Sequence, residues 1–276
     1  MMILSIKNNN KIEFISFDIF DTLLLRNVPK PTDIFNIIEE KYELKGFKQQ
    51  RLKAEILARK KKPEEEVTLD EIYFYLQEHN KKYELEIEKE SLYANKELLE
   101  LFSEVKKMGK KIICISDMYL DKQYIVDILE KNGFDGIDEV FVSSDVMLTK
   151  EKGTLYPYVL KSLGVTSDKV IHIGDNYKSD VVQAKLQGIQ AIHYEQKLNK
   201  VIKSSCEYKQ SIMNNTIKSL QHAKLLSDGK VELINNFSST SNCQIKWLIF
   251  STKAILIKCK IMGLVWCINR AFKKFN

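Results

Sequence analysis

The residues best suited to chemistry stand at the ends of four apolar runs rich in β-branched residues. Runs of this length between polar residues predict buried strands. The polar residues that follow them are Asp18, Ser116, Asp117, Lys150, Asp175 and Asp180. Open α/β folds bind ligands at the carboxyl ends of their strands, so we expect these side chains to share one site. Ordinary turn residues would explain each of them taken alone, and the prediction therefore depends on all four runs together.

Three of these acids, Asp18, Asp175 and Asp180, predict a cation site. Carboxylates that share a crevice repel one another, and some take up protons unless a metal ion neutralises them. Oxygen-only ligands favour Mg²⁺, which keeps several waters and binds one or two carboxylates together with a substrate phosphate. The alternative interpretation is a turn acid at Asp175 and a helix cap at Asp180.

The four motifs resemble those of the haloacid dehalogenase (HAD) superfamily, and they occur in the family's order over residues 12–194. The first is F-I-S-F-D-I-F-D-T-L-L-L at residues 14–25, and the last is V-I-H-I-G-D-N-Y-K-S-D at residues 170–180. The superfamily consists mostly of phosphatases and phosphotransferases. The phrase F-D-I-F-D-T-L-L-L-R at residues 17–26 also resembles a subgroup of predicted HAD hydrolases found with glycosyltransferases of bacterial surface polysaccharides.

The resemblance implies that Asp18 is a nucleophile. In the family, the corresponding aspartate attacks phosphorus and forms an aspartyl phosphate, an intermediate that replaces one hard displacement by two easier ones. The resemblance also implies that Asp18 shares Mg²⁺ with Asp175, Asp180 and the backbone carbonyl of Phe20. The Mg²⁺ ion would then hold the phosphoryl group and offset its charge.

Two further roles follow from the same resemblance. Ser116 would hydrogen-bond a phosphate oxygen. Lys150 would hold the nucleophile and the phosphate by charge, and Lys152 is a rival for that role two residues later. Asp117 is adjacent to the site, and we expect it to point elsewhere or to cap the following turn.

One position departs from the family pattern. Typical HAD phosphatases carry a second aspartate two residues after the nucleophile as the general acid and base, whereas this chain has Phe20 there and Asp21 one residue later. Neighbouring side chains in an extended segment point in opposite directions, so Asp21 is a candidate catalytic residue whose role stays open. General acid catalysis contributes about 10²–10⁴-fold. A slow phosphatase, or one that acts on a good leaving group, is compatible with the loss of this general acid. Arg26 could reach a substrate anion or pair with an acid of the inserted domain.

The elements that would position these residues alternate between strands and helices. We expect strands at residues 12–17, 111–115, 139–142, 170–173 and 191–194. Such alternation predicts an α/β fold with a Rossmann-like parallel sheet covered on both faces. The predicted core is residues 1–28 and 109–196, and residues 29–108 form an inserted helical cap. Inside the cap Pro63 ends a helix, and Thr68 with Glu71 predicts a capping box.

The basic character of the chain lies in a C-terminal extension, residues 197–276. This extension holds 14 Lys or Arg against 3 Asp or Glu, whereas residues 1–196 hold 29 against 34. Its apolar segment 246–270 contains lysines that each cost about 2.5–3.5 kcal/mol at the centre of a membrane, so a spanning helix is disfavoured. We expect a basic amphipathic helix that lies on an anionic membrane surface. A helix packed on the core or on a partner is the alternative.

These observations predict a cytoplasmic enzyme, peripheral at the inner face of the membrane if the extension binds there. The 5 cysteines form no C-x-x-C pair and indicate reduced thiols. No module for nucleic acid is evident, so nucleic acid is not an expected partner. The expected activity is Mg²⁺-dependent hydrolysis of a small phosphate monoester, with a sugar phosphate as the narrower expectation from the subgroup. The alternatives are a metal-independent dehalogenase-like hydrolase and a catalytically weak HAD domain that serves surface-polysaccharide synthesis at the membrane.

Overall fold

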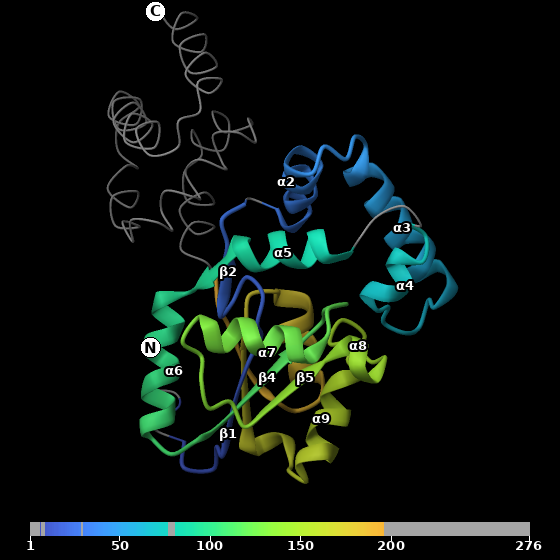
Figure 1. The fold of residues 1–276 in the computed structure, drawn as a ribbon. Coiled ribbons are helices and arrows are strands. Elements are labelled where there is room, and N and C mark those ends of the chain that lie inside the picture. The colour runs from blue at the N-terminus through green and yellow to red at the C-terminus, as the bar shows by residue number, and fades with distance from the viewer. Residues whose placement is uncertain (1–5, 7–8, 29, 77–80, 196–276) are drawn as a thin grey trace, which may run out of the picture. The chain divides into compact units, whose positions relative to one another are not determined.

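The computed structural model describes residue 6 and residues 9–28, 30–76 and 81–195 (Figure 1). The predicted basic extension, with its segment 246–270, lies outside the described residues. Within the described ranges, no helix combines the length and the apolar character needed to cross a membrane.

A five-stranded sheet in the order β5-β4-β1-β6-β7 forms the centre of the fold, and all its strand pairs are parallel. Its strands are β1 (Phe14–Phe17), β4 (Lys111–Ser116), β5 (Glu139–Val142), β6 (Val170–Gly174) and β7 (Gln190–His193). Every residue of β1 and β6 is buried, as expected of strands covered on both faces. The parallel sheet predicted from the sequence is therefore confirmed.

Helices cover both faces of this sheet. They are α6 (Lys96–Lys107), α7 (Lys122–Lys131), α8 (Ser143–Val146), α9 (Leu155–Leu163), a π-helical turn η3 (Tyr177–Gln183) and α10 (Ala184–Leu186), with a short 3₁₀ turn η2 (Ser167–Lys169) before β6. On one face Phe14 packs in a buried cluster with Leu155 and Tyr156 of α9. On the other face the ring of Phe17 lies 6.1 Å from that of Phe102 in α6. Helix α6, which the predicted boundary at residue 108 assigns to the cap, contacts β4 of the sheet.

The helical insert between β1 and β4 begins and ends in a two-stranded antiparallel sheet, formed by β2 (Leu24–Arg26) and β3 (Leu92–Ala94). Between these strands lie η1 (Pro31–Asp33), α2 (Ile34–Lys41), α3 (Phe47–Lys61), α4 (Leu69–Tyr73) and α5 (Lys81–Ser91). Figure 1 shows α2 to α5 gathered beyond one end of the sheet. The predicted capping box is present, because Thr68 accepts from the N–H of Glu71 and Glu71 accepts from the N–H of Thr68.

A buried ion pair in the insert also contacts the core. Arg51 is fully buried, and its Nε donates to Glu84 Oε2 at 2.6 Å. Tyr119, which follows β4, donates its hydroxyl to Glu84 Oε1 at 2.9 Å. The backbone carbonyl of Tyr119 accepts the N–H of Leu69 at the start of α4. These contacts place the insert beside the carboxyl end of β4, where the candidate site begins.

Candidate active site

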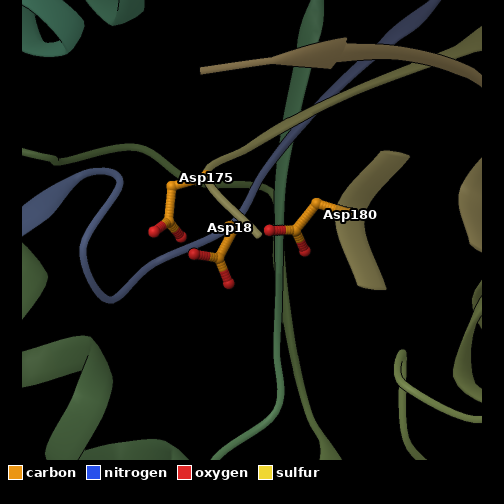
Figure 2. A group of neighbouring side chains, drawn as sticks. All are labelled: Asp18, Asp175 and Asp180. Atoms are coloured by element: carbon orange, nitrogen blue, oxygen red, sulfur yellow. The ribbon is translucent and has the colours of Figure 1, made fainter. Parts of the chain in front are cut away.

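Three carboxylates meet at the carboxyl ends of β1 and β6. Asp18 directly follows β1, Asp175 directly follows β6, and Asp180 lies in the π-helical turn η3. One oxygen of each lies within 4.8 Å of the others. Figure 2 shows the three carboxyl groups close together, with that of Asp18 between those of Asp175 and Asp180. The parallel register pairs the last residue of β1 with Ile173, and the N–H of Asp18 donates to the Ile173 carbonyl at 2.8 Å, so the two strand ends lie side by side.

Lys150 lies between two of these acids. Its Nζ donates to Asp18 Oδ1 at 2.5 Å and to Asp180 Oδ1 at 2.7 Å, and the side chain is almost fully buried. Burial opposes the charge of this lysine, but the two carboxylates raise its pKa well above the ordinary value. Lys152, its rival in the sequence, instead pairs with Glu64 at the surface. The structure therefore places Lys150, and not Lys152, beside the predicted nucleophile.

The electrostatic state of the acids fits a cation site. Burial raises the pKa of Asp18 to about 7 even though Lys150 opposes the shift. Burial and the neighbouring Asp18 raise the pKa of Asp175 to about 8. Burial also acts on Asp180, but Lys150 and His172 outweigh it and hold the pKa of that carboxyl below its usual range. A divalent cation would favour the charged form of both carboxyls and so oppose the burial and repulsion that raise these two pKa values. The donor set consists of carboxylate oxygens, which suits Mg²⁺.

Thr22 also belongs to the site, although its residue type and position did not predict this. Its side chain is fully buried, and Oγ1 donates to Asp18 Oδ2 at 2.9 Å. The same oxygen accepts the backbone N–H of Asp175 at 3.2 Å. Asn95, at the end of β3, donates to the Thr22 carbonyl at 2.8 Å. The available signal was a lone hydroxyl between two apolar runs, four residues after the predicted nucleophile.

Asp117 holds the loop that carries Lys150. Its carboxylate accepts the backbone N–H of Lys150 at 2.7 Å and that of Glu151 at 2.9 Å. Asp117 therefore does not cap the turn that follows it, as one of the two expectations had it, but points to the distant turn between α8 and α9. Ser116 is buried at the end of β4, and its role as a phosphate ligand stays a prediction.

Asp21 is held by an ion pair with Arg26. Its backbone is in the left-handed region, with φ 60°, and Oδ2 accepts from Arg26 Nη1 at 2.7 Å. Arg26 also donates through Nε and Nη2 to Glu88 Oε1 in α5. Of the two partners expected for Arg26, the structure thus shows the acid of the insert. The guanidinium carbon lies 4.9 Å from the centre of the Phe20 ring. The Phe20 carbonyl as a metal ligand and Asp21 as a catalytic group remain predictions.

A parallel sheet covered on both faces, with an inserted helical domain and an acid cluster at its strand ends, defines a Rossmann-like α/β protein with a candidate cation site. A family model described as haloacid dehalogenase-like hydrolase matches residues 12–187. The chain belongs to the haloacid dehalogenase-like hydrolases and is an enzyme of that family. No curated protein sequence matches the chain.

Solved structures with a similar fold come from the same superfamily. A HAD family enzyme from Bacteroides thetaiotaomicron shares 15% identity over 67% of this chain and 94% of its own, with a TM-score of 0.50. A mutant of that enzyme, in complex with magnesium and inorganic phosphate, shares 12% identity over 67% and 94%, with a TM-score of 0.47. The L-2-haloacid dehalogenase from Xanthobacter autotrophicus shares 17% identity over 74% and 89%, with a TM-score of 0.49. At these identities the likeness concerns the fold alone.

Proposed function

We propose that this enzyme is a Mg²⁺-dependent hydrolase of a small phosphate monoester that reacts through an aspartyl phosphate on Asp18. The observation that carries the proposal is the convergence of Asp18, Asp175 and Asp180 around one point, with the ammonium group of Lys150 against Asp18. The pKa values of Asp18 and Asp175 are raised and that of Asp180 is lowered. Three carboxylates in this arrangement are suited to a divalent cation. The proposed substrate class within phosphate monoesters is a sugar phosphate.

The side chains of the site would divide the reaction between them. An oxygen of Asp18 forms a bond to phosphorus while the bond to the leaving oxygen breaks, and that oxygen departs with the electron pair. Water then forms a new bond to phosphorus while the bond between phosphorus and the Asp18 oxygen breaks, and the electron pair of that bond returns to Asp18 as its carboxylate. The attacking water gives up a proton, the first leaving oxygen takes one up, and inorganic phosphate departs. Thr22 orients Asp18 through its hydrogen bond to Oδ2, and Lys150 offsets charge at Oδ1. When bound, Mg²⁺ would polarise the phosphoryl oxygens and offset their charge.

The experiment that tests this proposal is a panel of phosphate esters, sugar phosphates included, assayed with Mg²⁺ and with EDTA. The wild type is compared with Asp18→Asn and with the control Asp135→Asn, an exposed acid that pairs with Lys106. We expect turnover that requires both Mg²⁺ and Asp18 and that the control keeps. A covalent phosphoryl group should be trapped on the wild type by rapid acid quench. Turnover that persists in EDTA, or in Asp18→Asn, would contradict the mechanism.

The metal-independent dehalogenase-like hydrolase is the first rival activity. The panel therefore includes a 2-haloacid such as 2-chloropropionate. Halide release in EDTA, without any phosphatase activity, would favour that rival. The acid cluster favours the metal-dependent reaction, because Lys150 offsets only one of the three negative charges and a divalent cation would offset the others.

The second rival is a catalytically weak domain that serves surface-polysaccharide synthesis at an anionic membrane. Phe20 in place of the second aspartate, and Asp21 held by Arg26, are the observations that favour it. Its membrane part depends on the segment 246–270, outside the described residues. Co-sedimentation with vesicles rich in phosphatidylglycerol is expected for the full chain and not after deletion of residues 245–276. Equal sedimentation of both proteins would remove the membrane partner from the proposal.

A further inference from the structure

His172 is the one ionisable residue inside the buried strand β6, in the run V-I-H-I-G. Its ring is fully buried between two polar groups. Nδ1 lies 2.8 Å from the hydroxyl oxygen of Ser16 in β1, and Nε2 lies 3.3 Å from Asp180 Oδ1. The ring also meets Tyr156 edge to face, with 5.4 Å between the ring centres. A buried histidine with a polar partner on each nitrogen has a defined orientation.

The partners of the ring also define its tautomer. The neutral imidazole of a histidine carries a single N–H, on either Nδ1 or Nε2. The ionised carboxylate of Asp180 can only accept a hydrogen bond, so the proton belongs on Nε2. Nδ1 is then an acceptor, and the Ser16 hydroxyl donates to it. Asp180 thus selects the Nε2–H tautomer, and Ser16 stabilises it because its hydroxyl can donate to the unprotonated Nδ1.

Asp180 is surrounded by donors on its remaining sides. Lys150 Nζ donates to Oδ1 at 2.7 Å, and the backbone N–H of Asn176 donates to Oδ2 at 2.9 Å. A Cβ added at Gly174 would lie 2.4 Å from the Asp180 carboxyl carbon, so this carboxyl lies against the backbone of β6. Lys150 donates to both Asp180 and Asp18. A small rotation of the Asp180 side chain would therefore also shift the Lys150 ammonium relative to Asp18.

We infer that His172 is a positioning residue, whose Nε2–H fixes Asp180 so that Lys150 stays in contact with the nucleophile. The hydrogen-bonded series runs from Ser16 through His172, Asp180 and Lys150 to Asp18. This inference rests on the proposed roles of Asp18 and Asp180. Groups that orient the residues of a metal site typically contribute about 10–100-fold to metal affinity or activity.

Two substitutions of similar size separate positioning from packing. The side-chain amide of Gln reaches the place of the histidine Nε2, whereas that of Asn reaches only the place of Nδ1. His172→Gln therefore keeps a donor for Asp180, and His172→Asn loses it. We expect about 10–100-fold lower kcat and weaker Mg²⁺ binding for His172→Asn, with values near those of the wild type for His172→Gln. Mg²⁺ binding is measured by calorimetry, and kcat is measured well below the Tm of each variant.

The tautomer gives a readout that does not depend on turnover. In the wild type, ¹⁵N NMR of the His172 ring should show a protonated Nε2 and an unprotonated Nδ1. Ser16→Ala removes the donor to Nδ1 and should shift this pattern toward a mixture of tautomers. The Ser16 change removes only one oxygen, so it also tests the inference if His172→Asn fails to fold.

Three results would overturn the inference. The first is a kcat and an Mg²⁺ affinity equal to those of the wild type in both the folded Asn variant and the folded Gln variant. The second is equal loss of both in the two variants, since packing alone would then explain the effect. The third is an Nδ1–H tautomer in the wild type. If the wild type hydrolyses no phosphate ester, the proposed function fails separately, while Mg²⁺ affinity and the NMR pattern still decide the role of His172.

Discussion

Asp21 Oδ2 accepts a hydrogen bond from Arg26 Nη1 at 2.7 Å, and this contact ties the turn after the nucleophile to the base of the insert. Arg26 lies in β2 and is almost fully buried, and its other nitrogens donate to Glu88 of α5. Asp21 is thus connected through a single guanidinium to the insert. A shift of α5 would act on the turn that leads back to Asp18. Inserts of this kind close over a site and exclude water.

Loss of the Arg26 guanidinium should therefore lower both stability and turnover. Arg26→Gln leaves Glu88 buried without its cation, and breaking a buried pair in this way costs about 3–5 kcal/mol. We expect a lower free energy of unfolding in urea and a lower kcat. The control is Lys41→Gln, because Lys41 pairs with Glu86 at the surface and such pairs contribute at most about 1 kcal/mol. Equal stability of the two variants would contradict a structural role for Arg26.

Thr22 is expected to act through its hydroxyl group. Thr22→Val keeps the shape of the side chain and removes the donor to Asp18 Oδ2, whereas Thr22→Ser keeps that donor. A hydrogen bond to a charged group contributes about 1.5–3 kcal/mol, which corresponds to roughly a 10–100-fold loss of kcat in the valine variant. Steady-state kinetics with Mg²⁺ measures this effect. Similar kcat values for the serine and valine variants would show that the hydroxyl is dispensable.

Lys150 should be necessary for turnover, whereas Lys152 should not. Lys150→Met removes the cation from between Asp18 and Asp180. Loss of one preorganised charge-stabilising donor typically costs about 10²–10³-fold in kcat. Lys152→Met is the matched control, since Lys152 pairs with Glu64 at the surface. A larger loss of kcat in the Lys152 variant would reverse the assignment made from the structure.

The raised pKa values of Asp18 and Asp175 predict a specific dependence of stability on pH. Both carboxyls have an ordinary value of 3.8, and in the metal-free folded protein their pKa values are about 7 and about 8. Between about pH 3.8 and about pH 8 the folded state binds more protons than the unfolded state, so the free energy of unfolding falls as pH rises. We expect the Tm in EDTA to fall across this range.

Mg²⁺ should reverse this trend, because it binds the deprotonated carboxylates. The rise in Tm caused by Mg²⁺ is expected to be larger at about pH 8 than at about pH 5.5, with proton release on binding. Thermal unfolding and calorimetry in two buffers measure these effects. Asp135→Asn should behave as the wild type, and an Mg²⁺ effect independent of pH would contradict the pKa values of the two acids.

Local patterns in the sequence were enough to predict the sheet and the main acids. The apolar runs that end at Phe17 and Ile173 formed adjacent buried strands, since a strand covered on both faces needs apolar residues throughout. Parallel strands bring their carboxyl ends to one edge, so Asp18 and Asp175 came together as predicted. The capping box of Thr68 and Glu71 was predictable because its partners are three residues apart.

The contacts between distant segments could not be predicted in this way. Arg26 and Glu88 are 62 residues apart, and Ser16 and His172 are 156 residues apart. Each residue alone was compatible with a different role, and only their proximity in the folded chain selects one. The sequence by itself determined where the strands lie along the chain and the types of residue at their ends, whereas the order of the strands in the sheet came from the structure. The tertiary structure decided which side chains meet, because the registry of β1 with β6 and the docking of α5 set the distances between groups that are far apart in the chain.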